Sequence, residues 1–441
     1  MAASPEQRKQ YHVTKDFKGI NTKANRTSIA ENEFAWLENA QPIGAGNLKV
    51  TQAQITVNTS SNVAVAWSNT VSHIESCNLN SNDYLVAFKA DGSAQAFNIT
   101  TSTLSNVATA GTFSASGVQM TQWKDERAMI IDPANGLYTW DGTSLISIGS
   151  VGLIAVTNGG SGYTSAPAVQ ISAPNQANGV QATAVATITA NAVSSVILTE
   201  AGTGYTAAPT ITFSGGGGTN AAAVASYTTF KTGTVSVTVL NGGSGYTNAA
   251  NITVSFSGGG GSNAAATAVT SGNIITQIVM TNPGTGYTSA PSVTISGGGG
   301  SNAVVRANVV TSPNVDVATF SGRVWVAQGR SVYYSAANSY SDFISVSAGA
   351  ITLTDSTLHN QIRALLSANN FLYIFGDDSI NVFSDVRVTN TGATLFTNTN
   401  VSASVGSRRI NAIFPNFRYV LFMNQYRSEE HTSELQSQFR I

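Results

Sequence analysis

Residues 284–300 read Gly-Thr-Gly-Tyr-Thr-Ser-Ala-Pro-Ser-Val-Thr-Ile-Ser-Gly-Gly-Gly-Gly, and this stretch is the clearest copy of a unit of about forty residues that occurs four times. Every copy contains Gly-Ser-Gly-Tyr-Thr or Gly-Thr-Gly-Tyr-Thr, and the four tyrosines are Tyr163, Tyr205, Tyr246 and Tyr287. Their spacings of 42, 41 and 41 residues are too regular for chance. The sequence therefore predicts four small repeats over residues 151–312, which we call the repeat array.

Each repeat combines a strand pattern with a turn. Runs such as Ser-Val-Thr-Ile-Ser (292–296) alternate apolar and polar residues, with the period of a half-buried β-strand. Three copies continue into four glycines followed by Thr/Ser-Asn-Ala, at 215–221, 258–264 and 297–303, whereas the first copy reads Ser-Ala-Pro-Asn-Gln-Ala-Asn-Gly at 172–179. The alternation predicts folded β-structure rather than a disordered glycine-rich segment.

The repeat array is almost uncharged. It carries only Glu200, Lys231 and Arg306 among its 162 residues, and it holds 26 of the 41 glycines. The whole chain of 441 residues has a formal net charge of −1, which gives no basic footprint for nucleic acid. The single cysteine, Cys77, excludes an intramolecular disulfide and is expected in or near a core. No stretch approaches the roughly 20 apolar residues of a membrane helix, so no membrane span is expected.

Strand–turn–strand patterns lie on both sides of the repeat array. Asp-Gly and Asn-Gly between alternating apolar runs favour hairpins, because these residues tolerate positive φ. The predicted hairpins span residues 84–99, 128–140, 323–335 and 371–383, and a fifth begins at 419. Their recurrence favours a β-propeller, with a β-sandwich as the alternative. The predicted fold is all-β: a partial, C-terminally truncated β-propeller with an inserted array of four small β-rich repeats.

The last residues differ from the rest in composition. Residues 427–437 read Arg-Ser-Glu-Glu-His-Thr-Ser-Glu-Leu-Gln-Ser, which resembles an in-frame translation of a sequencing adapter. We expect the authentic chain to break off near Tyr426; the alternative is an amphipathic C-terminal helix. The expected organisation is an N-terminal segment with a short helix (1–50), first propeller blades (51–150), the repeat array (151–312), further truncated blades (313–426) and an artefactual tail (427–441).

Three patches outside the repeat array resemble one protein family. Residues 15–23 read Lys-Asp-Phe-Lys-Gly-Ile-Asn-Thr-Lys, a predicted helix at 28–39 ends in Leu-Glu-Asn, and Phe-Ser-Gly-Arg-Val-Trp-Val-Ala occupies 320–327. These patches resemble the tail nozzle proteins of short-tailed bacteriophages, also called tail tubular or packaged-DNA stabilisation proteins. The opening phrase lacks the second glycine of the family's pattern.

The resemblance implies a virion structural protein of the phage tail. Family members form a ring, of six copies, around the channel through which viral DNA is ejected. The implied partners are other copies of the chain, the portal or adaptor, and tail fibre proteins. The Gly-Tyr repeats resemble modules in structural proteins of marine phages, and we expect them on the surface, where they contact the host. The alternative is an adhesin-type repeat protein that binds a host surface glycan, on the virion or another extracellular surface.

The sequence offers no catalytic constellation. It contains no HExxH, paired CxxC, GxSxG or Walker A motif. The repeat array has no aspartate, which removes the usual oxygen ligands of calcium-binding repeats. His12, His73 and His359 have no spaced partner, and Asp377 and Asp378 adjoin between two predicted strands, which indicates a hairpin tip rather than a glycosidase pair. We therefore expect no enzyme activity, no cofactor and no metal site.

The four repeat tyrosines are the candidate ligand-binding residues, and they have two interpretations. Exposed rings at Tyr163, Tyr205, Tyr246 and Tyr287 would stack on sugars through their apolar faces. Alternatively, each ring fills the small core of its own repeat, because a repeat has few other large residues to bury. The core interpretation is favoured.

Overall fold

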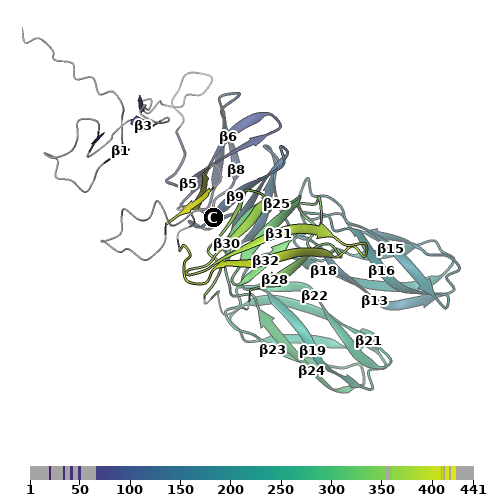
Figure 1. Cartoon of the computed structure of the whole chain (residues 1–441). Helices are drawn as coiled ribbons and strands as arrows, with labels where there is room; N and C mark the ends of the chain where they lie inside the picture. Colours follow the sequence, from purple (N-terminus) through teal and green to yellow (C-terminus); the bar gives the residue numbers. More distant parts are fainter. Residues whose placement is uncertain are drawn as a thin grey trace, which may run out of the picture. The chain divides into compact units, whose positions relative to one another are not determined.

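The computed structural model describes residues 66–353, 358, 360–408, 410, 413–416 and 419–423, together with four short strands nearer the N-terminus (Figure 1). The chain divides into two compact units, residues 1–66 and 67–441. The first unit contains the short strands β1 (Gly19–Ile20), β2 (Glu33–Phe34), β3 (Ala40–Pro42) and β4 (Leu48–Val50). Within the predicted helix, the described pair Glu33–Phe34 is instead a strand that pairs with β1. The predicted artefactual tail lies outside the described residues.

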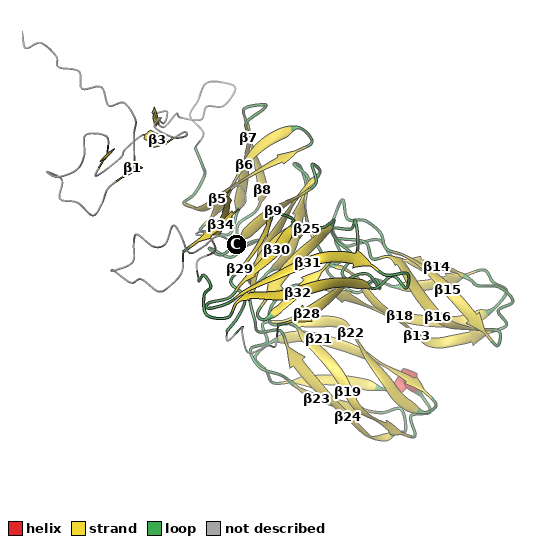
Figure 2. Ribbon diagram, in the orientation of Figure 1, coloured by secondary structure: helices red, strands yellow, loops and turns green. Residues whose placement is uncertain are grey.

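The second unit is built almost entirely from antiparallel strands (Figure 2). Four four-stranded sheets flank the repeat array, and we call them the scaffold sheets. The first is β5 (Val71–Leu79), β6 (Asn82–Lys89), β7 (Ala94–Asn98) and β8 (Thr103–Ala108). The second is β9 (Gln119–Trp123), β10 (Arg127–Asp132), β11 (Gly136–Trp140) and β12 (Leu145–Ser147).

Two more scaffold sheets follow the repeat array. The third is β25 (Asn314–Phe320), β26 (Arg323–Gln328), β27 (Ser331–Tyr334) and β28 (Gly349–Thr352). The fourth is β29 (Ala364–Ala368), β30 (Phe371–Phe375), β31 (Ile380–Val388) and β32 (Thr394–Ser402), and a hairpin of β33 (Ile413–Asn416) and β34 (Tyr419–Phe422) comes next. In every scaffold sheet the strands pair in chain order. The four predicted hairpins at 84–99, 128–140, 323–335 and 371–383 are therefore confirmed, whereas the strand at 419, predicted to begin a fifth, is the second strand of a hairpin that begins at Ile413.

The turn between β6 and β7 shows how the sequence reverses the chain. Asp91 Oδ1 accepts a hydrogen bond of 2.9 Å from the Ser93 N–H, and Gly92 adopts φ of +78°. A Cβ on Gly92 would stand 2.3 Å from the Phe113 carbonyl oxygen. The Asp-Gly pair thus combines a side-chain cap with a conformation and a close approach that glycine alone allows without strain.

A hydrophobic core lies between each scaffold sheet and the next. Phe88 and Trp140 belong to a core between the first and second sheets, and Trp325 and Phe383 belong to one between the third and fourth. The second and third sheets also share a core, which includes Trp123, although the repeat array separates these sheets in sequence. The scaffold is therefore continuous across the insertion. The described residues do not form a closed ring of sheets.

The repeat array forms two six-stranded modules. The first module (150–228) contains β13 (Ser150–Ser161), β14 (Ala168–Ile171), β15 (Thr183–Thr189), β16 (Ala192–Glu200), β17 (Ile211–Ser214) and β18 (Thr219–Thr228). The second module (235–309) contains β19 (Val235–Ser244), β20 (Thr253–Ser257), β21 (Ser262–Ser271), β22 (Ile274–Thr285), β23 (Ser292–Ser296) and β24 (Ser301–Val309). Each module contains two repeats.

Within each module the strand pairing is nested. The first strand pairs with the sixth, the second with the fifth and the third with the fourth. Every long ladder therefore joins one repeat to the other, and only the single residue pair between β14 and β15 lies within a repeat. This corrects the expectation that each forty-residue repeat has a core of its own and leans on the next. The folding unit is a pair of interlocked repeats.

The two modules are separate insertions into the scaffold. Ser150 pairs with Thr228 and Val235 pairs with Val309, so each module begins and ends at adjacent residues, as inserted domains do. The linker between them, residues 229–234, returns to the scaffold. Phe230 packs in the core between the second and third scaffold sheets. The single insertion predicted at 151–312 is thus interrupted by a scaffold contact.

Candidate functional site

The structure places all four repeat tyrosines in cores. Their exposed fractions are 3% for Tyr163, 1% for Tyr205, 4% for Tyr246 and 5% for Tyr287. These values agree with burial in a core, although that core is shared by the two repeats of a module and does not belong to one repeat. A sugar that stacks on tyrosine needs an accessible ring face, which none of these buried rings offers.

The four-glycine turns explain how three of the rings are held. A Cβ on Gly218 would stand 2.4 Å from the ring of Tyr163, and Gly261 has the same relation to Tyr287. A Cβ on Gly300 would likewise stand 2.4 Å from the ring of Tyr246. In each case the glycine and the tyrosine come from different repeats of one module. The two motifs of the repeat are therefore two halves of one contact, in which the backbone of one repeat lies against the ring of the other.

Tyr205 is held differently because its partner repeat lacks the glycine run. Its hydroxyl donates to the Ser172 carbonyl oxygen at 3.0 Å and accepts from the Ala182 N–H at 3.0 Å. Burial raises the pKa of Tyr205, although the hydrogen bond from Ala182 acts in the opposite direction. The phenol is thus a neutral, doubly hydrogen-bonded structural group.

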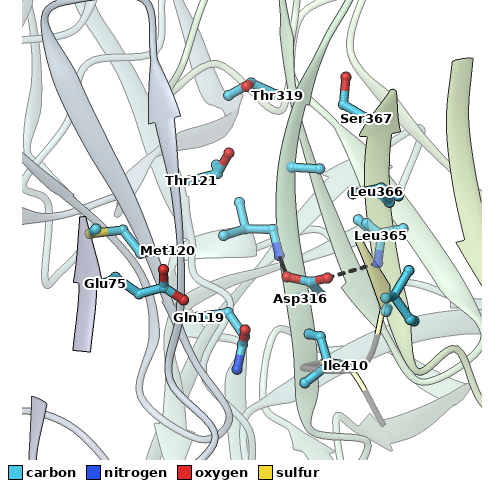
Figure 3. Close-up of a pocket in the computed structure, with 14 residues that line it drawn as sticks. Glu75, Gln119, Met120, Thr121, Asp316, Thr319, Leu365, Leu366, Ser367 and Ile410 are labelled. Atoms are coloured by element: carbon cyan, nitrogen blue, oxygen red, sulfur yellow. Dashed lines mark hydrogen bonds between the residues drawn. The ribbon is translucent and has the colours of Figure 1, made fainter. Parts of the chain in front are cut away.

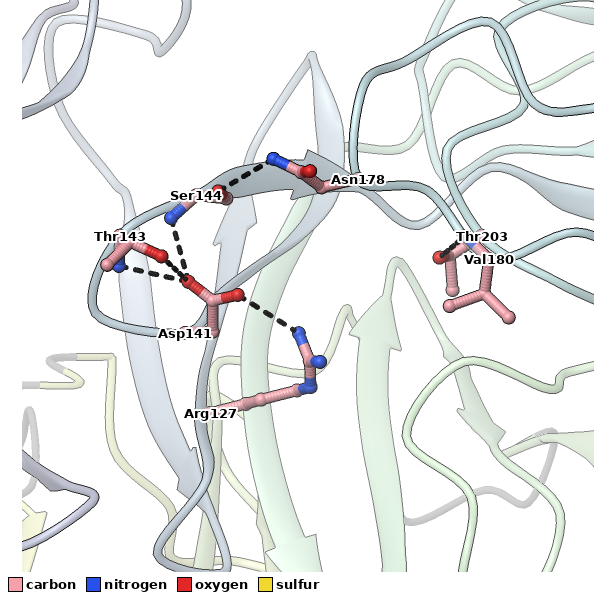
Figure 4. Close-up of polar contacts among 7 residues, drawn as sticks. All are labelled: Arg127, Asp141, Thr143, Ser144, Asn178, Val180 and Thr203. Atoms are coloured by element: carbon pink, nitrogen blue, oxygen red, sulfur yellow. Dashed lines mark hydrogen bonds and ion pairs between the residues drawn. The ribbon is translucent and has the colours of Figure 1, made fainter.

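The irregular loop of the first repeat attaches the first module to the scaffold. Gln176 Oε1 accepts from the Ser147 N–H at 2.8 Å, and the Asn178 amide donates to Ser144 Oγ at 3.0 Å. Figure 4 shows the second contact beside Asp141, whose carboxylate accepts from the Ser144 N–H at 2.7 Å. The first copy departs from the repeat pattern at the place where it contacts β12 and the turn before it.

A cavity lies where the first strands of the scaffold sheets meet. It has a volume of about 490 Å³ and is lined from β5, β9, β25, β29 and β33 by residues that include Glu75, Gln119, Asp316, Leu365 and Ile413. Figure 3 shows several of these side chains around it. The first strands of all four scaffold sheets therefore line one space.

Hydrogen bonds join these first strands side by side. Asn78 N–H donates to Gln122 Oε1 at 3.0 Å between β5 and β9, and Thr319 Oγ1 donates to the Gln122 carbonyl at 3.0 Å between β9 and β25. Asp316 Oδ2 accepts from the Leu365 N–H at 2.7 Å between β25 and β29 (Figure 3). Polar side chains thus align each sheet with the next.

Asp316 is the titratable group of this cavity with the largest shift. Its carboxyl is buried, and burial raises the pKa to about 7 although the N–H groups of Leu365 and Val317 act to lower it. Glu75, which faces the cavity from β5, raises it further. Its two hydrogen-bond donors are the backbone N–H groups of Val317 and Leu365, and neither is a basic side chain.

We expect Asp316 to contribute a fall of a few kcal/mol in the free energy of unfolding as pH rises from about 4 to about 7. In the unfolded chain Asp316 ionises near its ordinary pKa, whereas in the folded chain it keeps its proton up to about 7, so the folded state binds more protons in this window. Denaturant unfolding at a series of pH values measures the effect. Asp316→Asn should remove this contribution, so the stability difference between the variant and the unmodified chain should change across the window; a constant difference would contradict the assignment.

The other chemistry-bearing residues have structural partners. Asp377 accepts from Arg363 Nε at 2.5 Å and lies 3.6 Å from Arg408, which accounts for a structural role at the predicted hairpin tip. His73 contacts Glu75 at 2.7 Å, and Cys77 is buried, as predicted, with its pKa raised to about 12 by burial first and Glu75 second. The described residues contain no group of three or more potential metal ligands. His12 and His359 lie outside the described residues.

Membrane segments and similarity to known proteins were the last two sources of a functional assignment, and neither supplies one. No helix among the described residues is long and apolar enough to cross a membrane. Neither the protein-family models nor the curated proteins include a match to this chain. The functional proposal therefore rests on the chain's own sequence and geometry.

Proposed function

We propose that this chain is a virion structural protein, a subunit of a phage tail nozzle that lines and closes the DNA ejection channel. The observation that carries the proposal is the scaffold: successive four-stranded meanders whose first strands lie side by side around one cavity. Four-stranded meanders of this kind form the blades of β-propellers, which supports the proposal. The resemblance of residues 15–23 and 320–327 to nozzle proteins supplies the assignment to a phage tail.

The two modules support a role in which the scaffold assembles and the insertions stand apart from it. Each begins and ends at paired residues, so it can extend from the scaffold without breaking a sheet. The alternative function is an adhesin that binds glycans through the repeat tyrosines. The burial of all four rings does not support it. Host contact by another surface of the modules remains part of the proposal.

The nozzle proposal predicts a ring. We expect the chain to assemble into a closed oligomer and to bind a purified phage portal–adaptor complex, because a nozzle subunit joins its own copies and the tail above it. Light scattering gives the mass, negative-stain imaging gives the symmetry, and co-sedimentation tests the binding. A strict monomer that also fails to bind the portal–adaptor complex would contradict the proposal.

A further inference from the structure

A cleft opens within the first module, between β14 and β15. It has a volume of about 480 Å³ and is lined from β14, β15, β17 and the residues beside them. The two strands share a single residue pair, Ala168 with Val185, although both strands continue beyond it. Past this pair the ladder opens, so backbone edges of both strands border the cleft.

The alternation of backbone groups along β14 shows which of them face the cleft. The Ser172 N–H donates to the Thr210 carbonyl at 3.0 Å, on the side of β17, so the N–H and C=O of Ile171 point the other way, towards β15. The Gln181 side-chain amide donates to the Ile171 carbonyl, which agrees with this direction. In the described strands β15 pairs no residue with Ile171, so the Ile171 N–H has no ladder partner there.

A tyrosine hydroxyl shows what fits between the parted strands. The Tyr205 hydroxyl accepts from the Ala182 N–H and donates to the Ser172 carbonyl, and both hydrogen bonds are 3.0 Å long. One oxygen atom thus joins the two strands at the end of the cleft. A peptide strand inserted there would need its two neighbours about 9–10 Å apart, which two such bonds cannot span. The gap suits a hydroxyl group and excludes a third strand.

The walls of the cleft are neutral and rich in groups that hydrogen-bond. Among the described residues, those that line it include no charged and no aromatic side chain. Exposed amides and hydroxyls, which both donate and accept, come from Gln170, Gln181, Thr183, Thr210 and Thr212. A charged ligand would find no counter-ion in these walls, whereas a neutral ligand with many hydroxyl groups would find matching donors and acceptors.

The cleft belongs to the repeat that departs from the common pattern. A Cβ on Gly202 would stand close to the backbone on both sides of Gln181, and the matching motif glycines of the other repeats lie in the same way around Asn220, Asn263 and Asn302. Those three asparagines have positive φ, whereas Gln181 does not. The other repeats therefore show that the fold does not require the glutamine that crosses to β14.

We propose that the β14–β15 cleft binds a neutral saccharide, whose hydroxyl groups replace the missing ladder hydrogen bonds. One sugar hydroxyl accepts from the Ile171 N–H, and others bond to Gln170 and Thr212, whose side-chain oxygens lie 3.5 Å apart. Without ring stacking, a single site binds weakly, and copies in one assembly add avidity. The inference rests on the host-contact part of the proposed function and names its site and ligand class.

The test uses the full chain and saturation-transfer NMR with four neutral trisaccharides, built from glucose, mannose, galactose or N-acetylglucosamine. We expect at least one of them to bind. A trisaccharide of galacturonic acid, similar in size but charged, should not bind. Binding by none of the four neutral sugars, or equal binding of the acidic one, would overturn the proposal.

Variants locate the binding. Thr212→Val keeps the shape of the side chain and removes its hydroxyl, so it should weaken binding about fivefold or more, as the loss of one hydrogen bond does. Gln170→Ala should have a similar effect. Thr294→Val is the matched control, because Thr294 is the exposed counterpart of Thr212 on β23 of the second module, and it should bind like the unmodified chain. Unchanged affinity in both cleft variants would overturn the assignment of the site.

The mass of the same samples separates this inference from the nozzle proposal. A monomer that binds a neutral trisaccharide through the cleft would support the inference and contradict the nozzle. A ring that binds none of the four would support the nozzle and overturn the inference.

Discussion

Gly261→Ala should destabilise the second module by about 3 kcal/mol, because overpacking a filled core costs 1–3 kcal/mol and occasionally more. The new Cβ would stand 2.4 Å from the ring of Tyr287. Gly261 does not have positive φ, so the cost comes from close contacts with the Tyr287 ring and with the Tyr287 backbone nitrogen at 2.6 Å, and not from strain in the φ of residue 261. Hydrogen exchange of β19–β24 measures the local opening free energy without interference from the scaffold.

Gly258→Ala is the matched control in the same turn. Gly258 has φ of +76° and open space around its missing Cβ, so alanine there should cost only the ~1 kcal/mol of a left-handed residue. A double-mutant cycle then tests the contact between repeats: with Tyr287→Ala in place, Gly261→Ala should cost less, because only the 2.6 Å approach to the backbone nitrogen of residue 287 remains. Equal costs of Gly261→Ala with and without the Tyr287 ring would contradict the interlocked contact.

Phe230→Ala should destabilise the scaffold by about 3–5 kcal/mol, the usual cost of emptying a buried phenylalanine site. Phe230 makes edge contacts with Tyr333 and Phe343, at ring distances of 5.6 and 4.9 Å. Its carbonyl accepts from the Asn314 amide at 2.8 Å. Denaturant unfolding gives the stability, and hydrogen exchange should show increased opening in β9–β11 and β25–β27.

Two deletions extend this prediction to the whole insertion. Replacing residues 151–227 and 236–308 by separate Gly-Ser linkers keeps 229–234 and should leave a soluble, folded scaffold. Removing all of 151–312 should give a less stable scaffold, because it also removes Phe230 from the core. If both deletions are equally stable, the linker does not contribute to the scaffold and the role assigned to Phe230 is wrong.

Much of the local structure could be predicted from the sequence. The alternation in runs such as 292–296 predicted strands, and the Asp-Gly turn at 91–92 predicted a hairpin, because strand period and turn conformation depend on a few adjacent residues. The repeat itself followed from spacing. The burial of Tyr287 and its counterparts also agrees with an argument from composition, since each repeat has few other large side chains.

The tertiary structure decided which strands pair and where the insertion attaches. The sequence contains four similar repeats, and nothing local to one of them shows that its first strand pairs with the last strand of its neighbour. The departure at 172–179 was visible, but its contact with Ser144 and Ser147 was not. Phe230 lay in a segment that looked like part of the repeat array.

Local sequence also does not show the cavity or which faces of the modules are exposed. Asp316 and Leu365 lie 49 residues apart, and Asn314 bonds to the Asp132 carbonyl 182 residues away. The raised pKa of Asp316 and the exposure of Thr212 in the β14–β15 cleft arise from what surrounds them after folding. Strand period and turns are properties of neighbouring residues, so the sequence determined them. Pairing, burial and exposure depend on residues far apart in the chain, so only the tertiary structure decided them.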